Sequence, residues 1–378
     1  MNNIVNIEVN DVVYGRVVDG KLELLPEAYY LPVTEFLKVL DKAEATANER
    51  SLIYNQFLAA RAEGCTSFDN HLFGRLWGGY GHVTIPTGYP NLDAFLDGGL
   101  RGGLMVIAAP PGRGKSTLAL QLARSLCKRQ AGVVYICNDM AREVLIAKML
   151  SGLSHEIARG KGGFTAREIL RNRENLTQNG EFLKTAGAYL AQTKSLYLET
   201  DQDARDVRAL EKLIDFYVSV FQYREELGYP PVIILDYLQN VRVDGKGNER
   251  EQVNAVVRML RSKVNDYGLA VIAISSVSRD KYPGALRMNS LKESGLIEYA
   301  CDLILALQHE AVHNDDYDEA RETGKPQQLM ELYVLKDRLG EAERSLPITF
   351  VPKYSLFRFH SKPHGGQTPV KQPMVEGF

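Results

Sequence analysis

Short apolar runs alternate with stretches of helical hydrophobic spacing along most of the chain. The runs at 231–238 and 269–277 are almost wholly apolar. Such a run, without alternation of polar and apolar residues, is typical of a strand that is buried on both faces. The segments 116–128 and 249–267 carry apolar residues at intervals of three and four, which predicts helices. This alternation predicts an α/β fold, a mostly parallel sheet with helices on both faces.

The two ends of the chain show other patterns. Residues 12–25 (VVYGRVVDGKLELL) predict a hairpin that turns at Asp19 and Gly20. Residues 34–62 have helical spacing, and this helix either belongs to a small N-terminal domain or docks on a neighbouring subunit. The end of the chain is rich in Pro and Gly, which predicts a disordered tail. The predicted organisation is an N-terminal α+β region (1–82), an α/β domain (83–362) and a tail (363–378).

The clearest chemical motif lies where an apolar strand meets a helix. Residues 107–120 read IAAPPGRGKSTLAL, in which GRGKS matches the end of the phosphate-binding P-loop. Ala109 stands where the strict pattern has Gly. Glycines let backbone N–H groups surround phosphate oxygens, and the helix N-terminus adds partial positive charge. We therefore predict a nucleoside triphosphate site made of Pro111, Gly112, Arg113, Gly114, Lys115, Ser116 and Thr117.

Three polar side chains have predicted roles toward ATP and Mg²⁺. Lys115 would reach the β- and γ-phosphates, and the Ser116 hydroxyl would hold the magnesium ion. Asp236 follows the apolar residues VIIL, and a carboxylate at the carboxyl edge of a parallel strand can hold the same ion through water. Since Asp can end any strand, this role is predicted only because the P-loop precedes it.

Composition and cysteine spacing mainly argue against particular classes of protein and site. Hydrophobic residues make up 45% and charged residues 24%, as in ordinary globular proteins. There is no apolar run long enough to span a membrane and no signal-peptide pattern, so a cytoplasmic location is expected, in a bacterium or a phage-infected host. The four cysteines form no C-x-x-C pair, which argues against a zinc site. The net charge of −2 neither requires nor excludes nucleic acid.

Several further stretches complete a pattern that belongs to a known family. In chain order they are TGYPNLDAFLDGGLRGGLMVIAAPPGRGKS, VVYICNDMAREVLIAKMLSG, VIILDYLQ, AVIAISSVSR, SLKESGLIEYACDLILAL and YVLKDRLG. From Thr87 to about His360 the chain thus resembles the ATPase domain of DnaB-type replicative helicases, a RecA-like fold that assembles as a ring. The resemblance implies an ATP-dependent DNA helicase, a hexameric ring of this chain that moves on single-stranded DNA in replication. The departures from the family pattern and the unmatched residues 1–82 favour a phage or mobile-element origin.

The resemblance implies catalytic roles for Lys115, Asp139, Lys336 and Arg338. Asp139 aligns with a family Glu that orients the attacking water, and as a shorter carboxylate it would need that water closer. Alternatively, Asp139 only caps the helix that follows. Lys336 and Arg338 align with a Lys-x-Arg pair that reaches the γ-phosphate held by a neighbouring subunit. The alternative for this pair is a solvated basic strand end.

Two loops are predicted to contact single-stranded DNA. Residues 242–250 and 279–295 mix Lys, Arg, Gly and polar residues, a composition suited to following a phosphate backbone. Without the resemblance these loops would be read as ordinary solvated turns, so the prediction of DNA contact rests on the family. In the family the segment matching LKESG contacts successive phosphates, although Arg is usual where Lys292 stands. A primase or loader protein is a candidate partner for residues 1–82, by elimination. The predicted DNA-binding residues are Arg242, Lys246, Arg250, Lys292, Glu293 and Gly295.

One departure from the family leaves a second function open. Ser276 stands where the family usually has a Gln that senses the γ-phosphate, and serine is too short to do so by the same reach. Together with Asp139, this favours the alternative of a RecA-like nucleotide-switched assembly protein, which hydrolyses ATP slowly and unwinds nothing. Recombination is disfavoured, because the DYLQ and LKESG stretches resemble the helicase branch.

Overall fold

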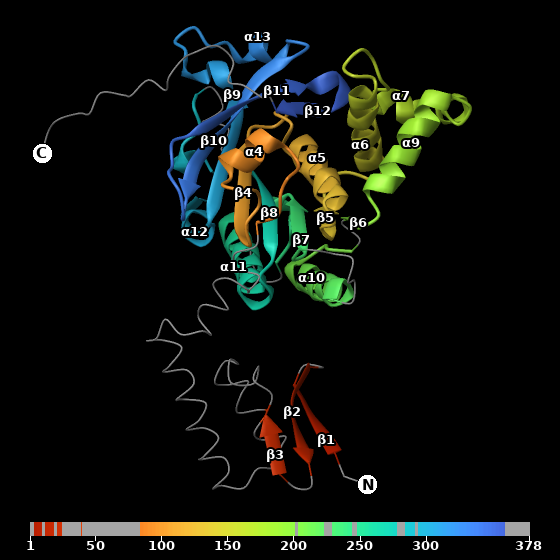
Figure 1. Ribbon diagram of the computed structural model, residues 1–378. Coiled ribbons are helices and arrows are strands. Elements are labelled where there is room, and N and C mark those ends of the chain that lie inside the picture. Colours follow the sequence, from red (N-terminus) through yellow and green to blue (C-terminus); the bar gives the residue numbers. More distant parts are fainter. Residues whose placement is uncertain are drawn as a thin grey trace, which may run out of the picture. The chain divides into compact units, whose positions relative to one another are not determined.

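The computed structural model describes residues 4–9, 12–18, 21–24, 39, 84–200, 203–222, 229–243, 248–277, 284–291 and 294–359 (Figure 1). The chain divides into two compact units, Met1–Gly79 and Tyr80–Phe378, which are described separately. The predicted tail (363–378) lies outside the described residues.

The first unit contains a three-stranded antiparallel sheet in the order β1-β2-β3. Its strands are β1 (Ile4–Val9), β2 (Val12–Val18) and β3 (Lys21–Leu24). Val18 pairs with Lys21, so the predicted hairpin is confirmed, with two residues between its strands. The helix predicted for 34–62 lies outside the described residues except at Val39, which is helical and buried.

The second unit is built on a nine-stranded sheet in the order β12-β11-β10-β9-β4-β8-β7-β5-β6. The strands from β9 to β6 run parallel, whereas β10, β11 and β12 are antiparallel to their neighbours. The predicted mostly parallel sheet is therefore confirmed. The strands are β4 (Gly103–Ala109), β5 (Val133–Cys137), β6 (Leu196–Thr200), β7 (Val232–Asp236), β8 (Ala270–Ser276), β9 (Leu303–His309), β10 (Gln328–Asp337), β11 (Ser345–Val351) and β12 (Leu356–Phe359).

Helices cover both faces of this sheet (Figure 1). In β4, Met105 and Ile107 pack in the cluster that contains α5, while Leu104 and Val106 pack in the cluster that contains α10 and α11. Burial on both faces explains why these strands read as continuous apolar runs. The helices are α4 (Pro90–Phe95), α5 (Lys115–Lys128), α6 (Arg142–Ile157), α7 (Ala166–Arg171), α8 (Arg173–Leu176), α9 (Gly180–Gln192), α10 (Val207–Gln222), α11 (Glu249–Tyr267), α12 (Ser294–Ala300) and α13 (Glu319–Thr323).

The order of the strands determines where the polar residues gather. Because β4, β5, β7 and β8 run parallel, the residues that follow them meet at one edge of the sheet, which we call the carboxyl edge. No helix among the described residues has both the length and the apolar character that crossing a membrane requires.

Candidate functional site

The P-loop lies at the carboxyl edge, between β4 and α5. Gly112 and Gly114 both have left-handed backbone conformations, with φ of 76° and 86°. A Cβ atom on Gly114 would lie 2.8 Å from Cζ of Phe357, so the close approach of β12 also requires glycine there. At Gly112 a Cβ would meet nothing within 4 Å. The crest of the loop is therefore open, as a cradle for phosphate requires.

Lys115 folds back onto its own loop. Its Nζ donates hydrogen bonds to the carbonyl oxygens of Ala109 at 2.6 Å and Pro110 at 2.9 Å. Burial lowers the pKa of Lys115 to about 8, while the nearby Asp236 carboxylate opposes that shift. A phosphate group would give this buried ammonium a charged partner, since burial of a charge is tolerated when it is paired.

Asp236 and Ser116 form the candidate magnesium site. Asp236 ends β7 and is only 2% exposed. Burial raises the pKa of its carboxyl group, and hydrogen bonds from Ser116 and Tyr135 oppose that rise. The described residues contain no group of three His, Cys, Asp or Glu side chains suited to a metal ion. One carboxylate and one hydroxyl fit Mg²⁺, which keeps water ligands and takes others from phosphate.

Tyr135 is a site residue that the sequence did not reveal. Its hydroxyl donates a hydrogen bond of 2.7 Å to Oδ2 of Asp236, and burial raises the pKa of the phenol well above its ordinary value. Tyr135 lies within the apolar strand β5, so its side chain reads as part of the core. Only the pairing of β5 with β7 shows that it faces the carboxylate.

Asp139 follows β5 at the same edge. Cys137, the last residue of β5, pairs with Asp236, and the backbone N–H of Asn138 donates to the Asp236 carbonyl at 3.0 Å. Asp139 is exposed. The alternative role as a helix cap is wrong, because α6 begins at Arg142 with Ala141 as its N-cap and no side-chain cap bond. Asp139 thus lies at the same edge of the sheet as Asp236, and it does not cap α6.

Arg113 turns its side chain away from the open crest of the loop. The guanidinium is buried and forms an ion pair with Glu319, and it donates a hydrogen bond of 2.7 Å to Oγ1 of Thr323. Both partners belong to α13, in the connection between β9 and β10. Any contact of Arg113 with phosphate would therefore come from its backbone N–H group.

The end of β8 is tied to the segment that follows β7. Nε2 of Gln239 donates to Oγ of Ser275 at 3.0 Å, and the Ser276 N–H donates to Oε1 of Gln239 at 3.4 Å. Gln239 is thus a second residue at this edge to which the sequence assigned no role. The signal that could have revealed it is its position in VIILDYLQ, shortly after the predicted metal ligand.

Lys336 and Arg338 lie at the opposite edge of the sheet from the P-loop. Because β10 is antiparallel to β9, its end at Asp337 pairs with Leu303, where β9 begins. A strand rises about 3.3 Å per residue, so the two ends of β4 are roughly 20 Å apart. The structure does not bring this basic pair to the P-loop of its own chain.

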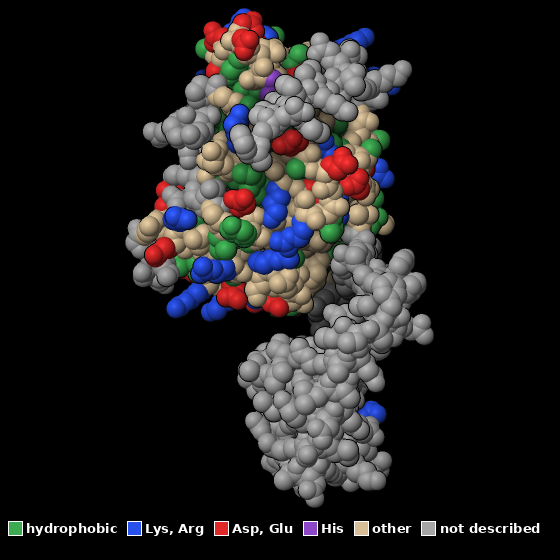
Figure 2. Space-filling model, turned by 90° about the vertical axis from the view of Figure 1, so that its left-hand side faces the viewer, with side chains coloured by type: hydrophobic (Ala, Val, Ile, Leu, Met, Phe, Trp, Pro, Cys, Tyr) green, Lys and Arg blue, Asp and Glu red, His purple; other side chains and the backbone are tan. Residues whose placement is uncertain are grey.

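Both basic side chains form hydrogen bonds at the end of α12, and Arg338 is also exposed to solvent. Nζ of Lys336 donates to the Cys301 carbonyl at 2.9 Å. Arg338 donates to Oδ1 of Asp302 at 2.9 Å and to the Tyr299 carbonyl at 2.8 Å. Figure 2 shows Lys and Arg side chains gathered on the side of the unit where α12 lies in Figure 1.

Only part of the predicted DNA-binding set is described. Arg242 and Arg250 are exposed, and Arg250 lies in the first turn of α11. The Nη2 atom of Arg250 lies 3.2 Å from the position that a Cβ would take on Gly295. The structure therefore brings the ends of the two predicted loops together. Lys246, Lys292 and Glu293 lie outside the described residues.

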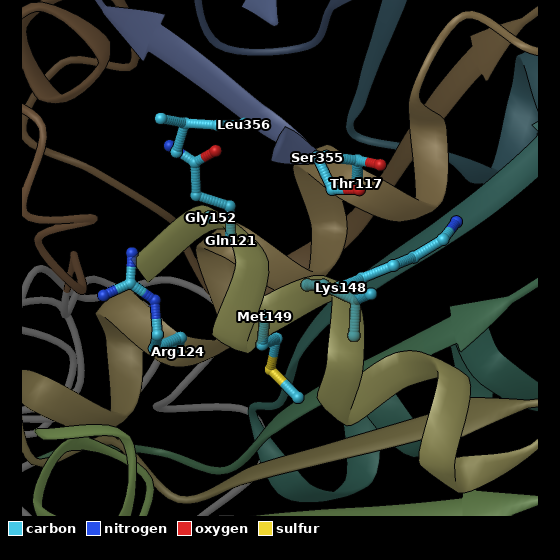
Figure 3. Close-up of a pocket in the computed structure, with 9 residues that line it drawn as sticks. Thr117, Gln121, Arg124, Lys148, Met149, Gly152, Ser355 and Leu356 are labelled. Carbon is cyan, nitrogen blue, oxygen red and sulfur yellow. The ribbon is translucent and has the colours of Figure 1, made fainter. Parts of the chain in front are cut away.

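Figure 3 shows a pocket next to α5, and its volume is too small for a nucleotide. Its walls include Thr117 and Arg124 from α5, Lys148 from α6 and Leu356 from β12. The space inside it is about 10 Å³, which is room for roughly one water molecule. The open crest of the P-loop, rather than this pocket, is therefore the candidate nucleotide site.

Sequence comparison identifies relatives of the second unit. The family model of the DnaB-like helicase C terminal domain matches residues 84–359. The replicative DNA helicase DnaB of Geobacillus stearothermophilus is 27% identical over 293 residues, which are 73% of this chain and 57% of that protein. The replicative DNA helicase DnaC of Bacillus subtilis (strain 168) is 28% identical over 287 residues, with the same coverage. The chain thus spans little more than half the length of these relatives.

Solved structures share the fold of the chain. One, described as an ATPase domain, has a TM-score of 0.59 at 19% identity, and the match covers 80% of this chain and 97% of that one. Another, described as a DnaB-like replicative helicase and its interactions with primase, has a TM-score of 0.59 at 18% identity, covering 88% and 73%. These likenesses confirm the predicted RecA-like architecture.

Proposed function

The chain belongs to the DnaB-like helicase C terminal domain family, and we propose that it is an ATP-driven DNA helicase that works as a ring on single-stranded DNA in replication. The observation that carries the proposal is the separation of the P-loop from Lys336 and Arg338, which lie at opposite edges of one sheet. A site that needs both can be completed only by two copies of the chain.

Nucleotide binding is supported by the geometry of the P-loop. Its open crest at Gly112 and the N-terminus of α5 provide N–H groups for phosphate oxygens. Lys115 would exchange two carbonyl partners for the β- and γ-phosphates of ATP. Bound Mg²⁺, held by Ser116 and Asp236, would offset the negative charge of the phosphates.

Hydrolysis would use residues from both subunits. In the proposed mechanism Asp139, at the carboxyl edge, orients the attacking water and accepts its proton. Lys336 and Arg338 of the neighbouring copy stabilise the charge that develops on the γ-phosphoryl oxygens, a contribution worth ~10³–10⁵ in rate for arginine fingers. The gap between subunits thereby becomes the active site.

The DNA contacts are proposed for the two loops whose ends meet at Arg250 and Gly295. Lys and Arg side chains in these loops would neutralise phosphates without reading bases. Residues 1–82 lie outside the family match and are proposed to bind a primase or loader. One similar structure is described as a DnaB-like replicative helicase and its interactions with primase, which supports a primase as a candidate partner of this chain. The bacterial or phage-infected cytoplasm is the proposed location.

The decisive experiment is steady-state ATP hydrolysis with and without single-stranded DNA. The wild type should be stimulated by DNA, Asp139→Ala should lose turnover, and Asp139→Glu should retain it, because a carboxylate remains at the same edge. Nucleotide binding, measured by equilibrium titration, should survive in both variants. Turnover in Asp139→Ala equal to that of the wild type would remove Asp139 from the mechanism.

A second function is favoured by one specific observation. The backbone N–H of Ser276 is bonded to Gln239, and the serine side chain is too short for the sensing role that a Gln would have there. A nucleotide-switched assembly protein would bind ATP, hydrolyse it slowly and show no stimulation by DNA. If the wild type behaves in this way and Asp139→Glu raises its turnover, the switch replaces the helicase as the function.

A further inference from the structure

We infer that Asp302 is a positioning residue, which sets the place from which Arg338 reaches the ATP site of the neighbouring subunit. This inference rests on the proposed function, in which Arg338 acts on the nucleotide of another copy. Asp302 lies in the short link between α12 and β9, at the edge of the sheet opposite the P-loop.

Asp302 binds Arg338 through both its backbone and its side chain. The N–H of Arg338 donates to the Asp302 carbonyl at 2.8 Å, and Nη1 of Arg338 donates to Oδ1 at 2.9 Å. The ion pair is partly exposed, with 42% of the Arg338 side chain and 26% of the Asp302 side chain accessible. Arg338 is therefore held by its backbone and by both Nη atoms of its guanidinium, while the accessible part of its side chain can meet a partner.

The carboxylate that anchors Arg338 is itself fixed. Its Oδ2 atom accepts hydrogen bonds from Nη1 of Arg261, in α11, and from the N–H of Leu104 at 2.9 Å. The Asp302 N–H donates in turn to the Leu104 carbonyl at 2.8 Å. With Oδ2 held from two sides, the position of Oδ1 is determined, and so is that of the guanidinium bonded to it.

Gly103 lets this carboxylate approach the strand. A Cβ atom on Gly103 would lie 2.8 Å from Oδ2 of Asp302. Gly103 and Leu104 begin β4, and the same strand leads at its other end into the P-loop. Asp302 therefore connects Arg338, which would serve the neighbouring site, to the strand that carries the chain's own nucleotide site.

The α12 helix connects the same point to the predicted DNA-binding segment. Gly295 lies in its first turn, and the Tyr299 carbonyl near its end accepts from Nη2 of Arg338. The Glu298 and Cys301 carbonyls accept from Lys336. A shift of α12 caused by DNA would therefore displace the carbonyl groups that accept hydrogen bonds from Lys336 and Arg338. Asp302 would stay in place, because Arg261 and Leu104 hold its carboxylate.

The test uses two subunits that are inactive separately. Lys115→Ala removes the P-loop lysine but keeps Arg338, whereas Arg338→Ala keeps the P-loop but lacks the guanidinium. A mixture of the two should regain DNA-stimulated ATP hydrolysis, because a Lys115→Ala subunit can supply Arg338 to its neighbour. Asp302→Asn is then added to the Lys115→Ala subunit, whose own site is already inactive, so that any effect comes through Arg338.

We expect the Asp302→Asn mixture to lose turnover by about 10- to 100-fold in kcat, since a misplacement near 1 Å can cost ~100-fold. The KM for ATP should stay unchanged, because the P-loop in the hydrolysing subunit is intact. The exposed Asp315→Asn substitution in the same Lys115→Ala background is the matched control and should leave the regained turnover as it was.

Unchanged or increased turnover with Asp302→Asn would overturn the inference. If that variant fails to fold or assemble, Arg261→Met replaces it, since this change removes one of the two donors to Oδ2 and leaves Asp302 in place. A smaller loss of kcat supports the inference, and no loss overturns it. Failure of the first mixture to regain any activity would instead refute the action of Arg338 on a neighbour, and with it the proposed active site.

Discussion

The Tyr135 hydroxyl donates a hydrogen bond of 2.7 Å to the buried carboxylate of Asp236. Tyr135 lies in the interior of β5 and Asp236 at the end of β7, and the two strands are neighbours in the parallel part of the sheet. The bond fixes the Oδ2 atom of the carboxylate that, with Ser116, forms the candidate magnesium site. An apolar strand thus contributes a polar group to the nucleotide site.

Removal of that hydroxyl should weaken the magnesium site. In Tyr135→Phe the carboxylate loses a donor that lowers its pKa, so the pKa of Asp236 should rise further. The Mg²⁺ concentration that gives half-maximal ATP hydrolysis should increase, and a buried acceptor left with fewer partners should cost about 1–3 kcal/mol of stability. Magnesium titration of hydrolysis and urea unfolding measure the two effects. Tyr333→Phe, in the middle of β10, is the control, and an equal effect of both variants would contradict the assignment.

The affinity for ATP should depend on the charge of Lys115. Burial lowers the pKa of this ammonium group from 10.5 to about 8, so the free protein loses the charge as the pH rises past 8. The dissociation constant for ATP, measured by fluorescence titration, should therefore increase above pH 8. The unfolded chain holds this proton up to pH 10.5, so Lys115 should make the nucleotide-free protein more stable as the pH rises between these values.

A lysine-to-arginine change provides the control for that pH dependence. Arginine stays charged at every pH used, so Lys115→Arg should bind ATP without a change of affinity near pH 8. If the affinity of Lys115→Arg for ATP still falls above pH 8, a group other than Lys115 causes the pH dependence.

The two loop glycines should differ in their tolerance of alanine. Both have positive φ, and a left-handed conformation costs a non-glycine residue about 1–2 kcal/mol. At Gly114 the added methyl group would also press on Phe357, and such overpacking adds about 1–3 kcal/mol. Gly114→Ala should therefore lower the free energy of unfolding more than Gly112→Ala does. Urea unfolding of the two variants side by side decides this, and equal losses would show that the contact with β12 relaxes at no cost.

The ion pair between Arg113 and Glu319 should respond unequally to the loss of either partner. The Arg113 side chain is 5% exposed and that of Glu319 is 38% exposed. Glu319→Gln leaves a buried cation without its counter-charge, whereas Arg113→Met leaves a carboxylate that water can reach. We expect Glu319→Gln to lower the free energy of unfolding by about 1–3 kcal/mol and Arg113→Met to lower it less, because a buried charge without a partner destabilises the fold more than an exposed one. Thermal unfolding measures both.

The double variant gives the internal check on this pair. Arg113→Met/Glu319→Gln should recover part of the stability lost in Glu319→Gln alone, since the double variant has no buried guanidinium without a counter-charge. A double variant that is less stable than either single one would contradict the explanation.

Local patterns in the sequence determined most of the architecture and the nucleotide site. Continuous apolar runs predicted the buried strands, and residues 12–25 predicted the hairpin between β2 and β3, because both depend on side chains close together in the chain. The P-loop was visible for the same reason, since its glycines, Lys115 and Ser116 are contiguous. Asp236 ends an apolar run, but its role was predicted only because the P-loop precedes it in the chain.

The tertiary structure decided what lies between distant segments. Hydrophobic pattern does not state the direction of a strand, so only the antiparallel pairing of β10 places Lys336 and Arg338 at the edge away from the P-loop. Tyr135 and Asp236 are 101 positions apart, and Arg113 and Glu319 are 206 apart. Such contacts depend on how strands and helices pack together, and a local sequence pattern does not determine that packing. The bond between Asp302 and Arg338 exists for the same reason.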